Sequence, residues 1–445
     1  MSRKLGRLIW RIFILLLFVT VCAVTIFIAY GYQIDFKMRD VRKTSIIDVA
    51  VRRQDAQVLM DNTQEALRLP YQIKNVLPGE HFLVVNKAGF KPWMRKVIVI
   101  EDIVSIVNDI LLVPENIGSY IRDMGEFSKD EKVIRGDDYL LHFLPGSKTI
   151  AITTIKDDGA VLAEEIDLSR GGLSDIAAFP RETMLLTFDD GSYAWANFHD
   201  RNFYFFTLLR GAASISVNEE AEMLYFLEEG NLYGIALEKL QGVKKSYDDY
   251  KLRENVSTYS TSLNGDIFFL SGGTLFKMNS QGRESRLVDF AAGAYKSLGM
   301  IQGKDYALLL LRGKDEKRRL ILLNRSGAYT VLNDSVKGNP IVNSYDQILF
   351  ATDGNVIYFI DPNVQQAPKL VTRIKGDFEI TGWFTDAGHF LIRQANLLIL
   401  SDVFDANKYT LLDDVNDTDE FISYHEVLFI LKKGLLSRLS FAADK

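Results

Sequence analysis

A run of nineteen uncharged residues near the amino terminus, 12–30, constrains this chain more than any other feature. A helix needs about 20 apolar residues to cross a hydrocarbon core about 30 Å thick, and this run meets that length. Its two threonines can bond back to helix carbonyls, so they are compatible with a spanning helix. We therefore predict a transmembrane helix over residues 12–30, with a membrane anchor formed by Ile12, Leu16, Phe18, Val21, Ile26 and Tyr30.

The charges around the run predict its orientation. Arg3, Lys4, Arg7 and Arg11 precede it, and residues 1–30 contain no acidic residue. Because basic residues remain on the cytoplasmic side, residues 1–11 are expected to form a cytoplasmic tail, and the bulk of the chain is expected outside the cell membrane. A cleaved signal peptide is the competing interpretation, but its apolar region is usually about 7–15 residues long. The longer run favours an uncleaved, single-pass anchor.

The exported part is acidic and has no cysteine. The whole chain carries a net charge of −6, and residues 1–30 contribute +4, which leaves −10 for the remainder. Nucleic-acid binding requires cationic surface, so we expect no nucleic-acid partner. The one cysteine, Cys22, lies inside the apolar run. The exported domains therefore depend on hydrophobic cores rather than on disulfides.

Residues 45–113 show short strand-like runs separated by Gly and Pro turns, which predict a small antiparallel sandwich. The turn at Leu77-Pro78-Gly79-Glu80 precedes one of these strands, and we expect Trp93 to pack in the core. The preceding residues, 31–44, look like a short extended stalk. The expected strands cover residues 45–51, 57–60, 71–73, 81–85, 96–100 and 106–113.

Three segments of this region resemble the PEGA domain family. Residues 77–81 match its turn, residues 87–93 match its glycine-aromatic-Pro-Trp segment, and residues 109–114 resemble its closing strand. The tetrad that names the family is replaced by Arg53-Gln54-Asp55-Ala56. The resemblance covers residues 31–116 and implies a PEGA-like β-sandwich over 45–116. It also implies an envelope setting, and it implies no catalytic activity.

A second pattern fills residues 118–445. A hydrophobic strand, a tight polar turn and another strand recur about every 40 residues, which marks a repeat architecture. Turns such as Asp189-Asp190-Gly191 and Asp353-Gly354-Asn355 are hairpin turns that need positive φ. The recurring strands are expected at residues 149–152, 184–187, 223–226, 267–270, 306–309, 347–350, 389–392 and 427–430.

Units of three or four strands without helices between them resemble the blades of WD-like and quinoprotein-like β-propellers. Eight recurrences indicate eight blades, and seven blades remain the alternative. A strand within residues 118–127 is expected to complete the last blade and close the ring, which would remove exposed sheet edges. The expected fold class is thus an all-β exported region, a small sandwich plus a seven- or eight-bladed propeller, behind one transmembrane helix.

No catalytic, cofactor-binding or metal-ligating motif is recognisable. The histidines form no HExxH pair or Cys/His cluster, and no nucleophile elbow or phosphate loop is present. The acidic turns at 157–159, 189–191 and 413–420 lack the ligand spacing of a calcium loop, which favours solvated turns. We therefore expect no catalytic residue, no metal and no cofactor.

Three aromatic residues are candidate ligand contacts: Tyr193, Trp195 and Trp383. Alternation within strands would instead place half of the aromatic side chains between blades, as core. Trp383 lies at the end of an expected inner strand, so it is the better placed of the three to face the channel.

Two functions follow from this organisation. The first is an anchored binding or scaffold module of the cell envelope, with an unknown protein or glycan as its partner. The alternative is an envelope hydrolase or lyase whose active site lies at the propeller channel. In that case acidic residues and His199 or His425 would converge there.

Overall fold

The computed structural model of the chain describes all residues except 1–2, 36–38, 52–54, 67–70, 127–130, 136–138, 156–160, 169–170, 180–182, 198–201, 208–212, 219–221, 243–246, 262–265, 291–294, 303–305, 314–316, 325–327, 344, 365–366, 385–387, 404–406, 417–418, 425–426, 433–434 and 442–445. It divides into two compact units. Unit 1 comprises Met1–Ile121, Phe404–Tyr409 and Leu439–Lys445, and unit 2 comprises Arg122–Val403 and Thr410–Arg438.

Unit 1 begins with the apolar helix α1 (Arg3–Ala29), in which Trp10–Ala29 is long and apolar enough to cross a membrane. Two strands follow, β1 (Tyr32–Asp35) and β2 (Asp40–Lys43), and they pair antiparallel. The segment 31–44, predicted as an extended stalk, thus contains a paired hairpin. The cross-strand pairing satisfies backbone groups that an extended single strand would leave to water.

Two sheets follow the hairpin and share one hydrophobic core. Trp93 lies fully buried in that core, as the sequence predicts. One sheet has the order β6-β3-β9 and the other the order β5-β4-β7-β8. Their strands are β3 (Ser45–Val51), β4 (Gln57–Met60), β5 (Thr63–Ala66), β6 (Tyr71–Val76), β7 (Gly79–Asn86), β8 (Trp93–Val99) and β9 (Ser105–Ile110).

The sandwich is not wholly antiparallel, which corrects the sequence-based prediction. Strand β9 pairs parallel to β3, with Ile47 opposite Ser105 and Val49 opposite Val107. The chain crosses from the second sheet to the first between β8 and β9, and such a crossover allows a parallel neighbour that a tight hairpin cannot form. A short 3-10 helix, η1 (Ile117–Tyr120), ends this region.

Unit 2 consists of four-stranded sheets in succession, antiparallel in every pair whose register is described. The first contains β11 (Lys132–Arg135), β12 (Tyr139–Phe143), β13 (Thr149–Ile155) and β14 (Val161–Asp167). The second contains β15 (Leu173–Phe179), β16 (Thr183–Phe188), β17 (Ser192–Asn197) and β18 (Asn202–Thr207). The third contains β19 (Ala213–Asn218), β20 (Met223–Glu228), β21 (Asn231–Ala236) and β22 (Lys251–Arg253), with the 3-10 helices η2 (Leu237–Gly242) and η3 (Asp248–Tyr250) before β22.

The later sheets repeat this plan. The fourth contains β23 (Val256–Thr261), β24 (Ile267–Ser271), β25 (Thr274–Met278) and β26 (Glu284–Asp289). The fifth contains β27 (Tyr295–Gln302), β28 (Tyr306–Gly313), β29 (Arg318–Asn324) and β30 (Tyr329–Asn333). The sixth contains β31 (Val336–Val342), β32 (Ile348–Thr352), β33 (Val356–Ile360) and β34 (Lys369–Arg373). The seventh contains β35 (Glu379–Phe384), β36 (His389–Gln394), β37 (Leu397–Asp402) and β38 (Lys408–Leu412).

The eighth sheet is built from two distant parts of the chain. Its order is β10-β41-β40-β39, so β10 (Ile121–Glu126) joins β39 (Glu420–Tyr424), β40 (Val427–Lys432) and β41 (Leu435–Ser440). The hydroxyl of Ser437 on β41 donates to Asp123 on β10 at 3.0 Å. The closing strand expected within residues 118–127 is thus confirmed.

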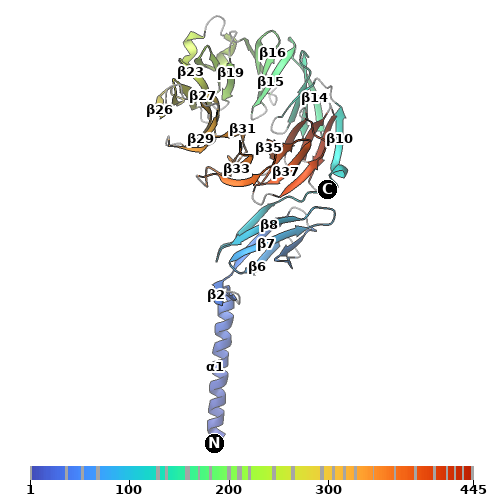
Figure 1. Cartoon of the computed structure of the whole chain (residues 1–445), viewed down its shortest axis with the longest axis vertical. Helices are drawn as coiled ribbons and strands as arrows, with labels where there is room; N and C mark the ends of the chain where they lie inside the picture. Colours follow the sequence, from blue (N-terminus) through green and yellow to red (C-terminus); the bar gives the residue numbers. More distant parts are fainter. Residues whose placement is uncertain are drawn as a thin grey trace. The chain divides into compact units, whose positions relative to one another are not determined.

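The sheets are arranged as a ring. Figure 1 shows them following one another in chain order, from green through yellow to red, with the cyan strand β10 beside the last, red sheet. The first strands of neighbouring sheets contact one another, as β23 does with β27 and β35 with β39. Inner strands in contact around a closed series of antiparallel sheets define a β-propeller-like region.

The second strand of each middle sheet is buried on both faces. Leu224 and Phe226 on β20 face the core shared with the preceding sheet, whereas Tyr225 and Leu227 face the core shared with the next one. Side chains alternate between the two faces of a strand, so a strand packed on both sides needs a continuous apolar run. This explains why the sequence shows one hydrophobic tetrad per repeat.

The first expected recurrence is displaced by one strand. Thr149–Ile152 lies on β13, the third strand of its sheet, whereas the later tetrads lie on second strands. His142 interrupts the apolar run on the true second strand, β12, so the longer run of β13 gave the stronger hydrophobic signal. The hairpin turns agree with expectation, since Gly191, Gly230 and Asn355 all have positive φ.

Candidate functional site

The apolar helix exposes the residues assigned to the membrane anchor. Ile12, Leu16, Phe18, Val21, Ile26 and Tyr30 each keep more than half of their surface exposed. The hydroxyls of Thr20 and Thr25 donate to the carbonyls of Leu16 and Val21, both at 2.8 Å, so their polarity is satisfied within the helix. This length and composition are those of a membrane anchor or of a signal sequence.

In unit 2, an irregularity recurs on the innermost strands. Six first strands, β15, β19, β23, β27, β31 and β35, carry a register shift against their second strand. Such β-bulges bend a strand and re-aim its side chains, and they gather at barrel rims and binding sites. The shifts fall at Ser174, Ser257, Leu298 and Thr381, within Ser214–Ile215 and within Gly338–Pro340, so they recur about every 40 residues. Ser214 and Asn339 represent the two longer stretches. We call these six positions the bulge ring.

Two members of the bulge ring use the same contact. The Ser174 hydroxyl donates to the carbonyl of Thr187 at 2.9 Å, and the Ser257 hydroxyl donates to the carbonyl of Leu270 at 3.2 Å. Both acceptors lie thirteen residues further along, on the second strand. Ser214, Ser257 and Asn339 are exposed, and Ser214 has a φ of 51°. The ring therefore presents irregular backbone near the start of the inner strands, with exposed polar side chains at Ser214, Ser257 and Asn339.

Polar contacts at the repeat spacing join three pairs of neighbouring sheets in the described part of unit 2. Lys132 and Asp175 form an ion pair at 3.2 Å, and Lys337 and Asp377 form one at 2.9 Å. The carboxylate of Asp175 lies on the inner strand β15, and that of Asp377 lies just before the inner strand β35. In both pairs the lysine comes from the preceding repeat and balances the negative charge. The hydroxyl of Tyr306 similarly donates to the carbonyl of Asp346, forty residues away, at 3.0 Å.

Trp383 lies at the seam between three inner strands. Its indole Nε1 donates to the carbonyl of Ile341 on β31 at 3.3 Å, and the Ser423 hydroxyl on β39 donates to the Trp383 carbonyl. The side chain is half-buried and meets Phe359 edge-on. Among the three candidate ligand contacts, Trp383 is the one that the structure places on an inner strand.

Tyr193 and Trp195 lie on β17, a third strand, within the core between the second and third sheets. Trp195 is only 4% exposed. Tyr193 is partly buried and stacks on Phe206, with the ring centroids 5.8 Å apart. The structure therefore separates these two residues from Trp383 and places them in packing positions between sheets.

Each described histidine lies beside a carboxylate. His81 Nδ1 is 2.7 Å from Asp61, and His142 Nδ1 is 2.7 Å from Glu131. His389 Nε2 lies 3.9 Å from Asp402, and both side chains are buried at the ends of adjacent strands. In the described part of the chain, no three His, Cys, Asp or Glu side chains gather as metal ligands. His199 and His425, which the enzyme alternative requires, lie outside the described residues.

The acidic turns have ordinary local contacts where they are described. The Asp190 carboxylate accepts from the backbone N–H of Ser192 at 2.8 Å, and the Asp419 carboxylate accepts from the N–H of Asn416 at 2.8 Å. Asp414 pairs with Lys432 at 2.6 Å. The turn at 157–159 lies outside the described residues. The described contacts cap turns, as Asx side chains commonly do.

One buried hydroxyl ties the third and fourth sheets together. The Tyr259 hydroxyl lies within hydrogen-bond distance of the carbonyls of Ser214 and Tyr225, and it accepts from the Ser216 hydroxyl at 3.0 Å. Burial raises the pKa of Tyr259 well above its ordinary value. The neutral phenol therefore persists at physiological pH, and it joins the bulge at Ser214 to the next sheet.

Sequence reasoning did not find the bulge ring. The sequence does contain a trace of it, because Ser174 and Ser257 are two repeats apart and each is the second residue of an inner strand. A single serine at a strand start has many possible roles, however. Only the register of each inner strand against its neighbour shows that these positions are equivalent.

Comparisons with known proteins bear on the fold alone. No protein-family model matches the chain, and no curated protein sequence matches it. Among solved structures, PorZ of Porphyromonas gingivalis aligns at 14% identity over 73% of this chain and 38% of its own, with a TM-score of 0.38. AztD from Citrobacter koseri aligns at 10% identity over 66% and 92%, with a TM-score of 0.43. YCF48, solved with a D1 peptide, aligns at 12% identity over 72% and 97%, with a TM-score of 0.40.

This chain thus spans well under half of PorZ, and the three similarities are distant. The class of protein rests on the chain's own topology. It is a propeller-like all-β protein that carries one apolar helix at its amino terminus.

Proposed function

We propose that this chain is a single-pass membrane protein whose exported, eight-bladed propeller binds or scaffolds a protein or glycan partner in the cell envelope. The helix α1 acts as an uncleaved anchor with its amino terminus in the cytoplasm. The region over residues 45–116 is a PEGA-like sandwich. The chain acts by binding, without catalysis.

The bulge ring carries this proposal. A binding face needs exposed polar groups on a rigid scaffold, because ordering a mobile surface costs affinity. The ring provides exposed Ser214, Ser257 and Asn339 on strands fixed by their neighbours. The nearby carboxylates Asp175 and Asp377 are paired with lysines, which suits recognition by hydrogen bonds and shape rather than by charge.

A photo-crosslinking experiment tests the proposal on the full-length chain in its membrane. A photoreactive amino acid is placed at Ser257 or Asn339, both exposed in the bulge ring. We expect each position to yield a discrete adduct with a protein or glycan, identified by mass spectrometry. Adducts absent from both positions, in cells that grow normally, would contradict a binding role for this face.

Val364 supplies the matched control. It lies in the connection between β33 and β34 and is 82% exposed. Successive strands of the sheet run antiparallel, so this connection lies at the opposite end from the start of the inner strand β31. The same photoreactive residue at position 364 should give no discrete adduct.

A further inference from the structure

The sandwich of unit 1 exposes a group of aliphatic side chains at one end. The connection between β8 and β9, with the residues that flank it, contains Ile98, Ile100, Ile103, Val104 and Ile106, which are 52% to 68% exposed. We call these five residues the aliphatic loop. Five exposed aliphatic side chains within residues 98–106 are unusual in water, and exposed apolar patches mark interaction sites.

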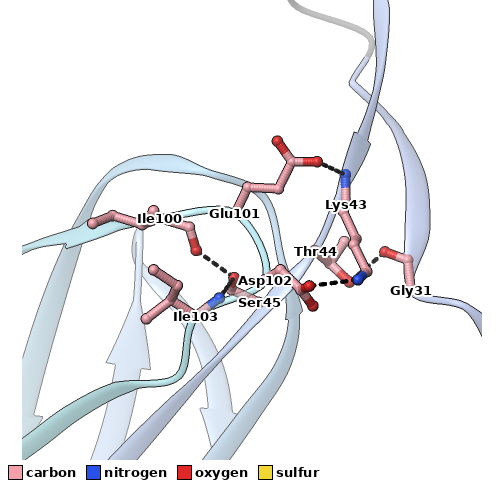
Figure 2. A network of polar contacts seen from close by, with 8 residues as sticks. All are labelled: Gly31, Lys43, Thr44, Ser45, Ile100, Glu101, Asp102 and Ile103. Atoms are coloured by element: carbon pink, nitrogen blue, oxygen red, sulfur yellow. Dashed lines mark hydrogen bonds and ion pairs between the residues drawn. The ribbon is translucent and has the colours of Figure 1, made fainter.

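The aliphatic loop is fastened to the segment that leaves the apolar helix. Gly31 comes two residues after the end of α1, and its carbonyl accepts from the N–H of Thr44 at 2.7 Å and from the Thr44 hydroxyl at 2.8 Å. The next residue, Ser45, donates its hydroxyl to the carbonyl of Ile100 at 2.5 Å and accepts from the N–H of Ile103 at 3.2 Å. Figure 2 shows this chain of contacts from Gly31 to the loop.

These contacts limit how far the loop can lie from the helix end. The path from Gly31 to Ile103 has three short steps: the Gly31–Thr44 hydrogen bonds, the spacing of about 3.8 Å between the adjacent Cα atoms of Thr44 and Ser45, and the Ser45–Ile103 hydrogen bond. Ile103 therefore lies within about 15 Å of Gly31. The polar layer on each side of a hydrocarbon core is about 5–8 Å thick. If α1 spans the membrane, the loop is therefore close enough to touch the membrane surface.

The charges of the loop are turned toward the hairpin. Lys43 donates its backbone N–H to the Glu101 carboxylate at 3.1 Å and its ammonium to the Asp102 carboxylate at 2.6 Å. In Figure 2 both carboxylates reach toward Lys43, while the side chains of Ile100 and Ile103 extend away from it. The pairing leaves an aliphatic surface beside partly neutralised carboxylates.

Apolar side chains continue from the helix onto the hairpin that follows it. Tyr32 on β1 stacks on Phe27 of α1, with the ring centroids 5.0 Å apart. Ile34 and Val41 are cross-strand partners in the β1-β2 hairpin and are 51% and 48% exposed. Aromatic and aliphatic side chains in this position are typical of the membrane–water interface.

We propose that the aliphatic loop inserts into the interfacial layer of the outer leaflet and forms a second membrane contact for the sandwich. This inference rests on the proposed membrane anchor. The occupant of the surface is lipid, because hydrogen bonds through Thr44 and Ser45 hold the loop close to the end of a helix that exposes apolar side chains along its length. The contact holds the sandwich against the bilayer. It therefore restricts rotation of the sandwich about the connection to the helix.

Fluorescence quenching in proteoliposomes tests the proposal on the full-length chain. Cys22 is the only cysteine, so a Cys22→Ser background allows single labelling at Ile103→Cys or Val104→Cys with an environment-sensitive fluorophore. The vesicles contain phosphatidylcholine with or without lipid that carries a nitroxide near the headgroup. We expect the nitroxide to lower emission at both positions at least twofold.

The matched control is Ala88→Cys in the same background. Ala88 is exposed and follows the end of β7, whereas the aliphatic loop lies at the other end of the β7–β8 pair. Eight residues of strand separate the two ends by about 25 Å, so the label at position 88 should lose little emission. Quenching at 103 and 104 no greater than at 88 would overturn the proposal.

Two further outcomes are distinguishable. A blue-shifted label at 103 that the nitroxide lipid does not quench would mean that protein covers the loop, which also overturns the proposal. The wild-type chain labelled at Cys22 tests the anchor separately, with a nitroxide deep in the acyl chains. Quenching at Cys22 without quenching at 103 leaves the anchor standing and rejects only the loop contact. Failure at Cys22 rejects the anchor, and the loop inference fails with it.

Discussion

The two units solve the problem of burying apolar surface in different ways. The sandwich has one core, in which residues from both sheets meet around Trp93. The propeller has a series of smaller cores, each shared by two neighbouring sheets, such as the one that joins Leu227 to Phe269. One core makes the sandwich an all-or-none unit. A series of interfaces resembles a repeat protein, in which damage at one interface is felt mainly by its neighbours.

Closure of the propeller into a ring of sheets changes the expectation that damage at one interface stays local. An open stack of sheets has two unprotected ends, whereas the eighth sheet joins β10 to β41 and leaves none. The closing sheet therefore stands apart from the other sheets, because its loss opens the whole series.

Replacing Trp93 by Ala should have the largest effect. Trp93 is fully buried in the single core of the sandwich, and truncating such a residue costs about 3–5 kcal/mol of unfolding free energy. Hydrogen exchange followed by mass spectrometry should show faster exchange across residues 45–110, while peptides of the propeller remain protected.

Phe269→Ala is the matched change in the propeller, since Phe269 is also fully buried. Faster exchange should be confined to the third and fourth sheets, which share its core. If exchange rose equally across all propeller peptides, the picture of serial cores would be wrong.

Leu436→Ala and Leu275→Ala compare the closing sheet with a middle sheet. Both leucines lie on third strands and are at most 2% exposed, so each substitution should cost about 2–5 kcal/mol. Leu436 belongs to the core that also contacts Met124 of β10 and Val133 of β11. We therefore expect Leu436→Ala to expose β10 and both ends of the propeller to limited proteolysis.

For Leu275→Ala, proteolysis should instead remain local to the fourth and fifth sheets, whose shared core contains Leu275. Identical cleavage patterns in the two variants would show that the closing sheet has no special role.

Tyr259→Phe removes the hydroxyl that joins two propeller sheets. The carbonyls of Ser214 and Tyr225 then lose a hydrogen-bond donor. Leaving buried polar groups unsatisfied lowers the free energy of unfolding by about 1–3 kcal/mol. Tyr71→Phe is the counterpart in the sandwich, where the hydroxyl donates to the carbonyl of Ala56 at 2.6 Å, and about 1 kcal/mol is expected. Urea unfolding of each variant measures the difference. A larger loss for Tyr71 would contradict the role of Tyr259 as the inter-sheet tie.

Alkaline pH should have the smallest effect, and it should be larger for the propeller. Burial raises the pKa of Tyr225, Tyr233, Tyr259 and Tyr306 in the propeller and of Tyr71 in the sandwich. Below about pH 10 these phenols are neutral in both states. Above it the unfolded phenols ionise more readily than the folded ones, so stability falls as pH rises.

Thermal unfolding of the propeller, measured from pH 8 to 10.5, should show that decline. Tyr306→Phe should flatten it by removing one of the raised groups. A midpoint that does not change over this range would show that burial of these phenols has no effect on stability.

The amino-acid sequence predicted much of the local structure. The strand over 45–51, the strand over 57–60 and the positive-φ turns at Gly191 and Asn355 occur where the pattern placed them. The parallel return of β9 and the β1-β2 hairpin were not predicted, because strand direction and pairing depend on which sheet a segment joins. The sequence favoured Trp383 over Tyr193 and Trp195 as a channel-facing residue, and the packing places Trp383 on an inner strand and the other two in a core between sheets.

The sequence by itself determined the apolar helix, the all-β class and the repeat of about 40 residues, because each depends on the order of apolar and polar residues along the chain. The tertiary structure decided the rest. It aligned Ser174 with Ser257, joined β10 to β41, and fastened the aliphatic loop to Ser45. These relations bring together residues 55 to more than 300 positions apart, and only the packing and register of the strands specify such pairs.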